Sequence, residues 1–327
     1  MTKKASENKF TKSYEFMLLV VVLALILILA LATGGKSIQA ANIIDILTSY
    51  SAYGVISIGC LFVIISGGID ISFMAVAAVA QYVMALFMLN IGGNFVMNYL
   101  ICAAVGAALG LVNAVLVNRL KVPTMIITIG TMNIIYGIMM KASNGKRLHG
   151  FPAWFSSKTK VSLFLVSVGT LAAMLVIAYL ILRRTKVGRK IFAIGGNMEA
   201  ARRSGINVLK VQLFVYGFAG AAAGLGALIK CYLTQQASIE ALYGDEMDVL
   251  AMVVLGGVSL SGGKGSVFGT LLGILLVAVL SNGMTLVGVS SYWKDLVIGA
   301  VILISFCITG WRVLQTQKKE RKGGSAE

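Results

Sequence analysis

Long apolar runs separated by short polar segments dominate the chain. A helix needs about 20 apolar residues to cross the hydrocarbon core of a bilayer. The candidate runs are residues 15–33, 45–66, 73–91, 96–118, 122–140, 161–183, 209–231, 247–260, 266–284 and 293–311. The run at 247–260 is short and rich in glycine at its end, so it could form a half-helix. The pattern predicts an all-α polytopic membrane protein with about ten transmembrane helices, some of them broken.

The positions of Lys and Arg predict the orientation of these helices. Lys3, Lys4, Lys9 and Lys12 precede the first run. With this end inside, most of the 28 Lys and Arg residues fall on inner segments, as the positive-inside rule requires. We therefore expect a cytoplasmic N-terminal segment (1–14), a single transmembrane domain (15–311) and a cytoplasmic tail (312–327). The first run is long enough to span and is interpreted as a retained helix.

Composition supports a membrane protein and argues against several other classes. The chain is 58% hydrophobic and 12% charged, with a mean hydropathy of +0.90, whereas soluble proteins carry about 25% charged residues. The net charge of +16 follows the topology and does not gather on one face, so no nucleic-acid partner is expected. The four cysteines have no paired spacing, and the single histidine, His149, has no cysteine cluster near it. We expect no metal site.

The sequence does not carry the motifs of an enzyme. The glycine-rich segment LGGVSLSGGKGS, residues 255–266, fails the phosphate-loop pattern because Gly265 follows Lys264 where Ser or Thr is needed. We therefore expect a transport protein that binds no cofactor itself. If ATP drives it, another subunit hydrolyses the ATP.

A polar insert interrupts the apolar pattern at residues 184–208. Its core reads TKVGRKIFAIGGNMEAARRSGINV over 185–208 and holds five basic residues. Basic inner loops are common in membrane proteins because of topology alone. Here, however, Asn197 is a suitable N-cap for a short helical piece over residues 198–204, and Glu199 in its first turn would favour the helix dipole. A short amphipathic helix parallel to the membrane suits a lever between a soluble motor and the membrane helices.

Asp70, in the segment SGGIDIS, is the one acidic residue between Asp45 and Glu199. A carboxylate near the bilayer centre costs about 2.5–3.5 kcal/mol, so it should face a partner or a water-filled path. Gly67 and Gly68 would allow a broken helix there. Alternatively, Asp70 caps the following helix at the cytoplasmic face. Both interpretations remain open.

Two further patterns concern a possible transport pathway. Thr124, Thr128 and Thr131 recur on one helix face, where they could bind sugar hydroxyls or satisfy a neighbouring helix; Asn133 and Asn282 raise the same choice. The segment GGIDIS at 67–72 is weakly echoed by GGVSLS at 256–261. Transporters are often built from repeats with glycine-interrupted helices next to the pathway, although six positions do not establish a duplication.

Four segments resemble the ribose-type permease subunits of bacterial ABC importers, within the branched-chain amino acid/ribose permease superfamily. They are SGGIDIS (66–72), KVPTMIITIGTM (121–132), GRKIFAIGGNMEAARRSGIN (188–207) and DEMDVLAMVVLGGVSLSGGKGSVFGTLLG (245–273). Their order and spacing match, and with the flanking helices the resemblance covers nearly the whole chain.

The resemblance implies a sugar permease that works by alternating access in the bacterial cytoplasmic (inner) membrane. Its partners would be a cytoplasmic ABC ATPase, which uses ATP, an extracytoplasmic substrate-binding protein and a second permease protomer. Pentoses and hexoses are the main substrates implied, with related polyols, autoinducer-2 and nucleosides as alternatives. The ATPase-coupling residues would be Gly188, Arg189, Gly195, Asn197, Glu199, Ala200, Ala201, Arg203, Ser204 and Gly205. The pathway or gate would include Gly67, Gly68, Asp70, Ser72, Thr128, Asn133, Gly256, Gly257 and Asn282.

One hypothesis and two rival functions complete the picture. A basic outer segment would help to dock the acidic residues of the binding protein through Lys141, Lys146, Arg147, Lys158 and Lys160. An ion-coupled secondary transporter, with Asp70 as its coupling carboxylate, is the first rival. A membrane scaffold without transport is the second.

Overall fold

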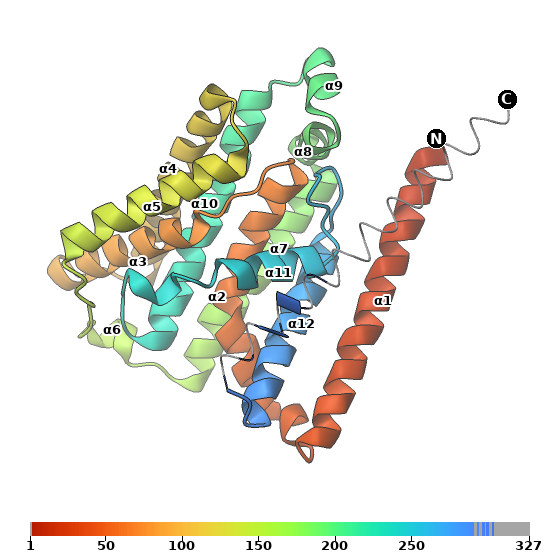
Figure 1. The fold of residues 1–327 in the computed structure, drawn as a ribbon. Coiled ribbons are helices and arrows are strands. Elements are labelled where there is room, and N and C mark those ends of the chain that lie inside the picture. Colours follow the sequence, from red (N-terminus) through yellow and green to blue (C-terminus); the bar gives the residue numbers. More distant parts are fainter. Residues whose placement is uncertain (1, 291–292, 294–295, 298, 301–302, 304–327) are drawn as a thin grey trace, which may run out of the picture.

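The computed structural model describes residues 2–290 together with residues 293, 296, 297, 299, 300 and 303, and these parts form an all-α bundle (Figure 1). The helices in chain order are α1 (Thr2–Ala32), η1 (Lys36–Ile38), α2 (Ala40–Ile65), α3 (Phe73–Asn90), α4 (Phe95–Leu120), α5 (Thr124–Ser143), α6 (Ala153–Ser156), α7 (Lys160–Arg184), α8 (Lys186–Gly196), α9 (Met198–Arg203), α10 (Val208–Thr234), η2 (Glu240–Leu242), α11 (Glu246–Leu255) and α12 (Val267–Leu286).

Eight helices within the described part of the chain are long and apolar enough to cross a membrane, which confirms a polytopic all-α membrane protein. They are α1, α2, α3, α4, α5, α7, α10 and α12. The run at 247–260 forms the short helix α11, which has 10 residues and agrees with the half-helix considered for it. The expected span at 293–311 falls largely outside the described residues.

The centre of the bundle is α10, which packs against α4, α2 and α3. Glycines allow α10 and α4 to touch backbone to backbone, because a Cβ at Gly106 would overlap the carbonyl oxygen of Gly220, and a Cβ at Gly220 would overlap that of Gly106. Gly110 and Gly224 continue the contact one turn further along each helix. Small residues four apart are a common interface between membrane helices.

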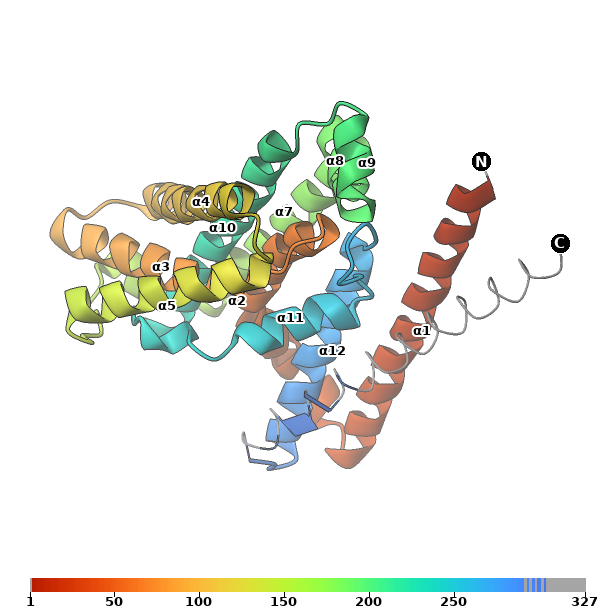
Figure 2. The same ribbon diagram turned by 45° about the horizontal axis from the view of Figure 1, so that its top comes forward.

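Helix α1 lies at the side of the bundle along α12 (Figures 1 and 2). The hydroxyl of Tyr14 donates to the carbonyl oxygen of Leu255 at 2.9 Å, and the Ser266 hydroxyl donates to Glu15. Large apolar side chains on α1, such as Leu27 and Leu31, are exposed, as are Ile126 and Ile138 on α5. In a membrane protein, such apolar surface suits contact with lipid or another subunit.

The two ends of the bundle carry different elements. Helices α8 and α9 lie at one end, which also holds the start of α1 and the end of α2, whereas α6 lies towards the other end (Figure 1). The turned view keeps α8 and α9 together beyond the ends of the long helices (Figure 2). We call these the α8–α9 end and the α6 end.

The polar segment at 234–248 packs into the bundle over much of its length. Ala237 pairs with Leu148 through two backbone hydrogen bonds of 2.9 Å. Beyond this bridge, Ile239, Leu242 and Glu246 are all buried. Helix α11 then continues to the glycine turn that begins at Gly256, packed between α2 and α12.

Candidate coupling site and inner turn

Helix α8 folds back tightly on the end of α7. The Thr185 side chain accepts a hydrogen bond of 3.1 Å from the Gly188 amide and so caps the helix. Gly188 is buried against α7, where a Cβ would overlap the carbonyl oxygen of Ile181 and come within 2.5 Å of that of Leu182. The expectation for this insert did not include a helix over residues 186–196. Ile191 and Ile194, spaced three apart, give α8 its buried face.

Helix α9 confirms the helical piece expected after Asn197, although it ends at Arg203. The Asn197 side chain accepts from the Ala200 amide at 2.9 Å, as an N-cap does. Ala201 is buried and anchors the helix, and Gly205 follows with a φ of +79°, a conformation in which glycine is favoured.

The outer surface of α8 and α9 is exposed and mainly polar. Glu199 forms an ion pair of 3.3 Å with Arg202, and both side chains are more than half exposed. The Ser204 hydroxyl donates to the carbonyl oxygen of Ala200. The predicted coupling residues on this surface are Arg189, Asn197, Glu199, Ala200, Arg203, Ser204 and Gly205. Exposed ion pairs of this kind contribute about 0–1 kcal/mol to stability, so the stability of the fold does not account for the charged side chains on this surface.

Two glycine-containing turns meet the end of α8, which brings together three of the four motif segments. The Gly263 amide donates to the carbonyl oxygen of Ile65 at 2.8 Å. A Cβ at Gly195 would overlap that same oxygen, and a Cβ at Gly262 would come within 2.7 Å of the Gly195 oxygen and of Gly67 Cα. We call this contact the glycine junction; it joins α8 directly to the turns after α2 and α11.

The turn at 66–72 is held by its own polar groups. Asp70 is buried and its Oδ1 accepts from the Ser72 amide at 2.8 Å and from the Ser72 hydroxyl at 2.6 Å. The Asn113 side chain on α4 donates to the same Ser72 hydroxyl at 2.6 Å. Burial raises the pKa of Asp70 above its ordinary value of 3.8, while the two hydrogen bonds from Ser72 lower it. Asp70 thus holds Ser72, the residue just before α3.

The threonine face of α5 binds the backbone of the same turn. Thr124 accepts a hydrogen bond from the Ile69 amide at 2.9 Å, and Thr128 accepts one from the Ile71 amide at 3.2 Å. Both hydroxyls therefore satisfy neighbouring backbone, the packing alternative for this stripe. The Thr131 hydroxyl donates within its own helix.

The other predicted pathway residues lie in three separate places. Gly256 and Gly257 form the turn after α11, where Gly257 has a φ of +84° and faces the Tyr14 ring. Asn282 forms a reciprocal pair of 3.1 Å hydrogen bonds with Asn42 between α12 and α2. Asn133 is exposed on α5 and donates to Ile129 of its own helix at 2.9 Å. Of this set, the geometry brings together Gly67, Gly68, Asp70, Ser72 and Thr128.

The basic residues proposed for docking lie in the segment around α6. Lys141, Lys146 and Lys160 are exposed. Arg147 forms an exposed ion pair of 3.7 Å with Glu240. Lys158 is partly buried and donates to the carbonyl oxygen of Leu233 at 2.8 Å, so it helps to close the end of α10. Among the described residues, no group of three or more His, Cys, Asp or Glu side chains could hold a metal ion.

Comparison with known proteins establishes the family. The family described as branched-chain amino acid transport system / permease component matches residues 42–306. The chain belongs to this family. It is therefore a membrane permease component, in agreement with the eight candidate spans in the described part of the chain and with the resemblance found in its motifs.

Named relatives of this permease are sugar import permeases. The ribose import permease protein of Escherichia coli is 35% identical over 274 residues, which cover 82% of this chain and 85% of that protein. The ribose import permease protein of Bacillus subtilis is 33% identical, with coverage of 82% and 84%. The galactose/methyl galactoside import permease protein of Salmonella typhimurium is 32% identical, with coverage of 82% and 85%. No solved structure matches the permease significantly.

Proposed function

We propose that this chain is the transmembrane permease subunit of an ABC importer that moves a small sugar across the bacterial cytoplasmic (inner) membrane. The named relatives, which import ribose and galactosides, support a pentose or hexose as substrate. ATP would be hydrolysed by a separate subunit, since the sequence lacks a phosphate-loop motif. The α8–α9 end would then face the cytoplasm.

The observation that carries the proposal is the glycine junction. The exposed surface of α8 and α9 offers a partner Glu199, Arg189 and Arg203. The buried side of α8 touches the turns after α2 and α11 through backbone atoms. A displacement of α8 would reach both turns directly, as alternating access driven by an ATPase requires.

Two further partners follow from the same proposal. The exposed lysines Lys141, Lys146 and Lys160 would meet acidic residues of an extracytoplasmic binding protein. A second permease protomer would cover part of the apolar surface of α5, where the Asn133 amide is exposed between apolar residues such as Ile134. Polar side chains at such places commonly hydrogen-bond across helix interfaces.

The test is purification of the tagged permease from its native host in mild detergent, with the associated proteins identified by mass spectrometry. An ABC ATPase should be recovered with the wild-type permease and lost with Glu199→Arg or Gly205→Trp. Lys146→Glu, at the α6 end, is the matched control and should retain the ATPase. Transport-active permease that consistently carries no ATPase would instead support the ion-coupled alternative.

A further inference from the structure

Three ionisable side chains meet between α2, α10 and the start of α11. The ammonium group of Lys230, on α10, donates a hydrogen bond of 2.6 Å to the Tyr53 hydroxyl on α2. The same hydroxyl donates to Oδ2 of Asp245, the residue just before α11, also at 2.6 Å. All three side chains are partly buried. The tyrosine hydroxyl thus bridges a cation and a carboxylate from distant parts of the sequence.

The carboxylate of Asp245 is not used where local structure would use it. An aspartate just before a helix commonly caps the helix by accepting from a backbone amide of its first turn. Within the described part of the chain, the Asp245 side chain makes no such bond to α11 and binds Tyr53 instead. Tyr53 and Lys230 lie in candidate spans, and ionisable side chains inside spans are costly and commonly functional. The formation of α11 alone therefore does not account for this bridge.

Two of the three helices in the bridge are fixed relative to each other. Helices α2 and α10 pack so closely that a Cβ at Gly59 would come within 2.9 Å of the carbonyl oxygen of Ala219. The close contact continues at Gly226, where a Cβ would come within 2.5 Å of the neighbouring side chain on α2. Small residues that bring membrane helices together in this way make a tight interface. The Lys230–Tyr53 half of the bridge is therefore its fixed half.

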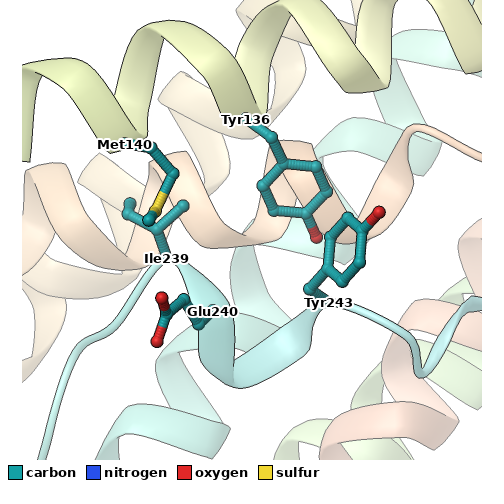
Figure 3. A pocket seen from close by; sticks show the side chains of 5 residues that line it. All are labelled: Tyr136, Met140, Ile239, Glu240 and Tyr243. Atoms are coloured by element: carbon teal, nitrogen blue, oxygen red, sulfur yellow. The ribbon is translucent and has the colours of Figure 1, made fainter. Parts of the chain in front are cut away.

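The start of α11, by contrast, follows a glycine that gives the backbone freedom. Tyr243 packs on α5, where its ring meets the Tyr136 ring edge to face with centroids 4.8 Å apart (Figure 3). Gly244 comes next with a φ of +97°, and a Cβ there would meet nothing within 4 Å. Glycine is thus favoured here by its conformation and not by close packing. Such residues at the ends of elements commonly serve as hinges, so the chain can turn between Tyr243 and Asp245.

The other end of α11 leads into the glycine junction, which α8 contacts. Tyr53 precedes Ile65 of the junction by twelve residues of α2, or about 18 Å at 1.5 Å per residue. The 10 residues of α11 cover about 15 Å by the same rule. Between the two ends, the Ser57 hydroxyl of α2 donates to the Met252 sulfur of α11 at 3.4 Å. Helix α11 therefore runs beside α2 from the bridge to the junction.

These contacts give α11 a charged hydrogen bond at one end and the coupling machinery at the other. We propose that Lys230, Tyr53 and Asp245 form a latch that holds the start of α11 on the bundle, and that displacement of the glycine junction by the ATPase releases it during transport. Hydrogen bonds to charged groups are strong, yet each is a single bond that can re-form. The three are positioning residues, because they act through α11. The latch rests on the proposed function and adds the place where the movement of α8 is resisted.

The test uses the complete importer reconstituted in proteoliposomes with its ATPase and binding protein. ATP hydrolysis without sugar-loaded binding protein, and uptake of radiolabelled D-ribose and D-galactose per ATP, are measured for the wild type, Tyr53→Phe and Asp245→Asn. We expect unstimulated hydrolysis to rise about three- to tenfold in both variants, the effect of one weakened or lost hydrogen bond, and uptake per ATP to fall. Tyr99→Phe is the matched control and should match the wild type, because the Tyr99 hydroxyl joins α4 to Thr170 of α7 at 2.7 Å, away from α11.

A bond that only stabilises the fold predicts a different result. Its loss would lower the melting temperature and reduce ATP hydrolysis and uptake in proportion, with no rise in unstimulated hydrolysis. That result, or wild-type values in both Tyr53→Phe and Asp245→Asn, would overturn the latch.

A measurement on the permease alone does not depend on the sugar or the ATPase. Hydrogen–deuterium exchange should be at least about threefold faster in peptides covering residues 244–252 of Tyr53→Phe than in the wild type, the local opening expected from one lost hydrogen bond. The same peptides of Tyr99→Phe should exchange as in the wild type. Unchanged exchange in Tyr53→Phe would overturn the latch. If the wild type neither takes up a sugar nor associates with an ATPase, the proposed function fails instead, and the exchange rates decide whether the bond holds α11.

Discussion

The Gly263 amide donates a hydrogen bond of 2.8 Å to the carbonyl oxygen of Ile65, and so joins the loop before α12 to the end of α2. Gly195, at the end of α8, lies against both of these atoms. The contact is made by backbone from three distant parts of the sequence. Only glycine fits at position 195, because any Cβ there would overlap the Ile65 oxygen.

Gly195→Ala is the first prediction. The added methyl group would meet backbone atoms that cannot rotate away, and overpacking of this kind costs about 1–3 kcal/mol. We expect a lower melting temperature of the purified permease and weaker stimulation of the ATPase by sugar-loaded binding protein. Gly196→Ala is the matched control, because a Cβ at Gly196 would meet nothing within 4 Å. Equal behaviour of the two variants would contradict a tight junction.

The interface between α4 and α10 gives a second prediction. Gly106→Ala should lower the melting temperature, since its Cβ would overlap the Gly220 oxygen and the loss is again about 1–3 kcal/mol. Gly169→Ala lies within α7 in open space and should raise stability by up to about 1 kcal/mol through helix propensity. Thermal unfolding in detergent measures both. A stabilising Gly106→Ala would show that the helices do not touch there.

Asp70 provides a third prediction. Asp70→Ala removes the acceptor of two hydrogen bonds from Ser72 and should destabilise the permease by about 1–3 kcal/mol. Asp70→Asn keeps a side-chain oxygen for both bonds, so it should retain most stability and most ATP-driven transport. Loss of transport in a well-folded Asp70→Asn variant would mean that the charge itself is needed, as ion coupling through this residue requires.

The fourth prediction concerns the α6 end. Replacing Lys141, Lys146 and Lys160 together by Glu should raise, several-fold, the concentration of binding protein that gives half-maximal ATPase activity. Because the effect is electrostatic between exposed groups, it should shrink as ionic strength increases. Lys121→Glu, an exposed position at the opposite end of the bundle, should have no such effect. An unchanged response of the triple variant would reject the docking hypothesis.

The sequence predicts the long helices well because the length of an apolar run is a local property. The run at 45–66 corresponds to α2 at Ala40–Ile65, and the run at 209–231 to α10 at Val208–Thr234. Helix α8 was not predicted, because its glycines at 188, 195 and 196 argue against a helix on propensity alone. In the structure, Gly188 is needed for close packing against α7, and Gly195 is needed for the glycine junction.

The candidate sites were predictable only where one segment contains all their parts. The Asn197 cap of α9 is local and could be recognised from sequence. The role of Asn113 beside Ser72 could not be, because it depends on how α4 crosses α3. The same holds for the ring contact between Tyr136 and Tyr243, whose segments only the folded bundle brings together.

The shortness of α11 has a consequence for how the protein is made. Its 10 residues cover about 15 Å, half of the hydrocarbon core, and the chain before it is not regular helix. Such backbone is tolerated at this depth only when protein covers it. Helix α2 is already synthesised when α11 emerges, whereas α12 follows it. The segment therefore cannot stay in lipid alone, and it can insert stably only once α12 has been made and packs with it beside α2.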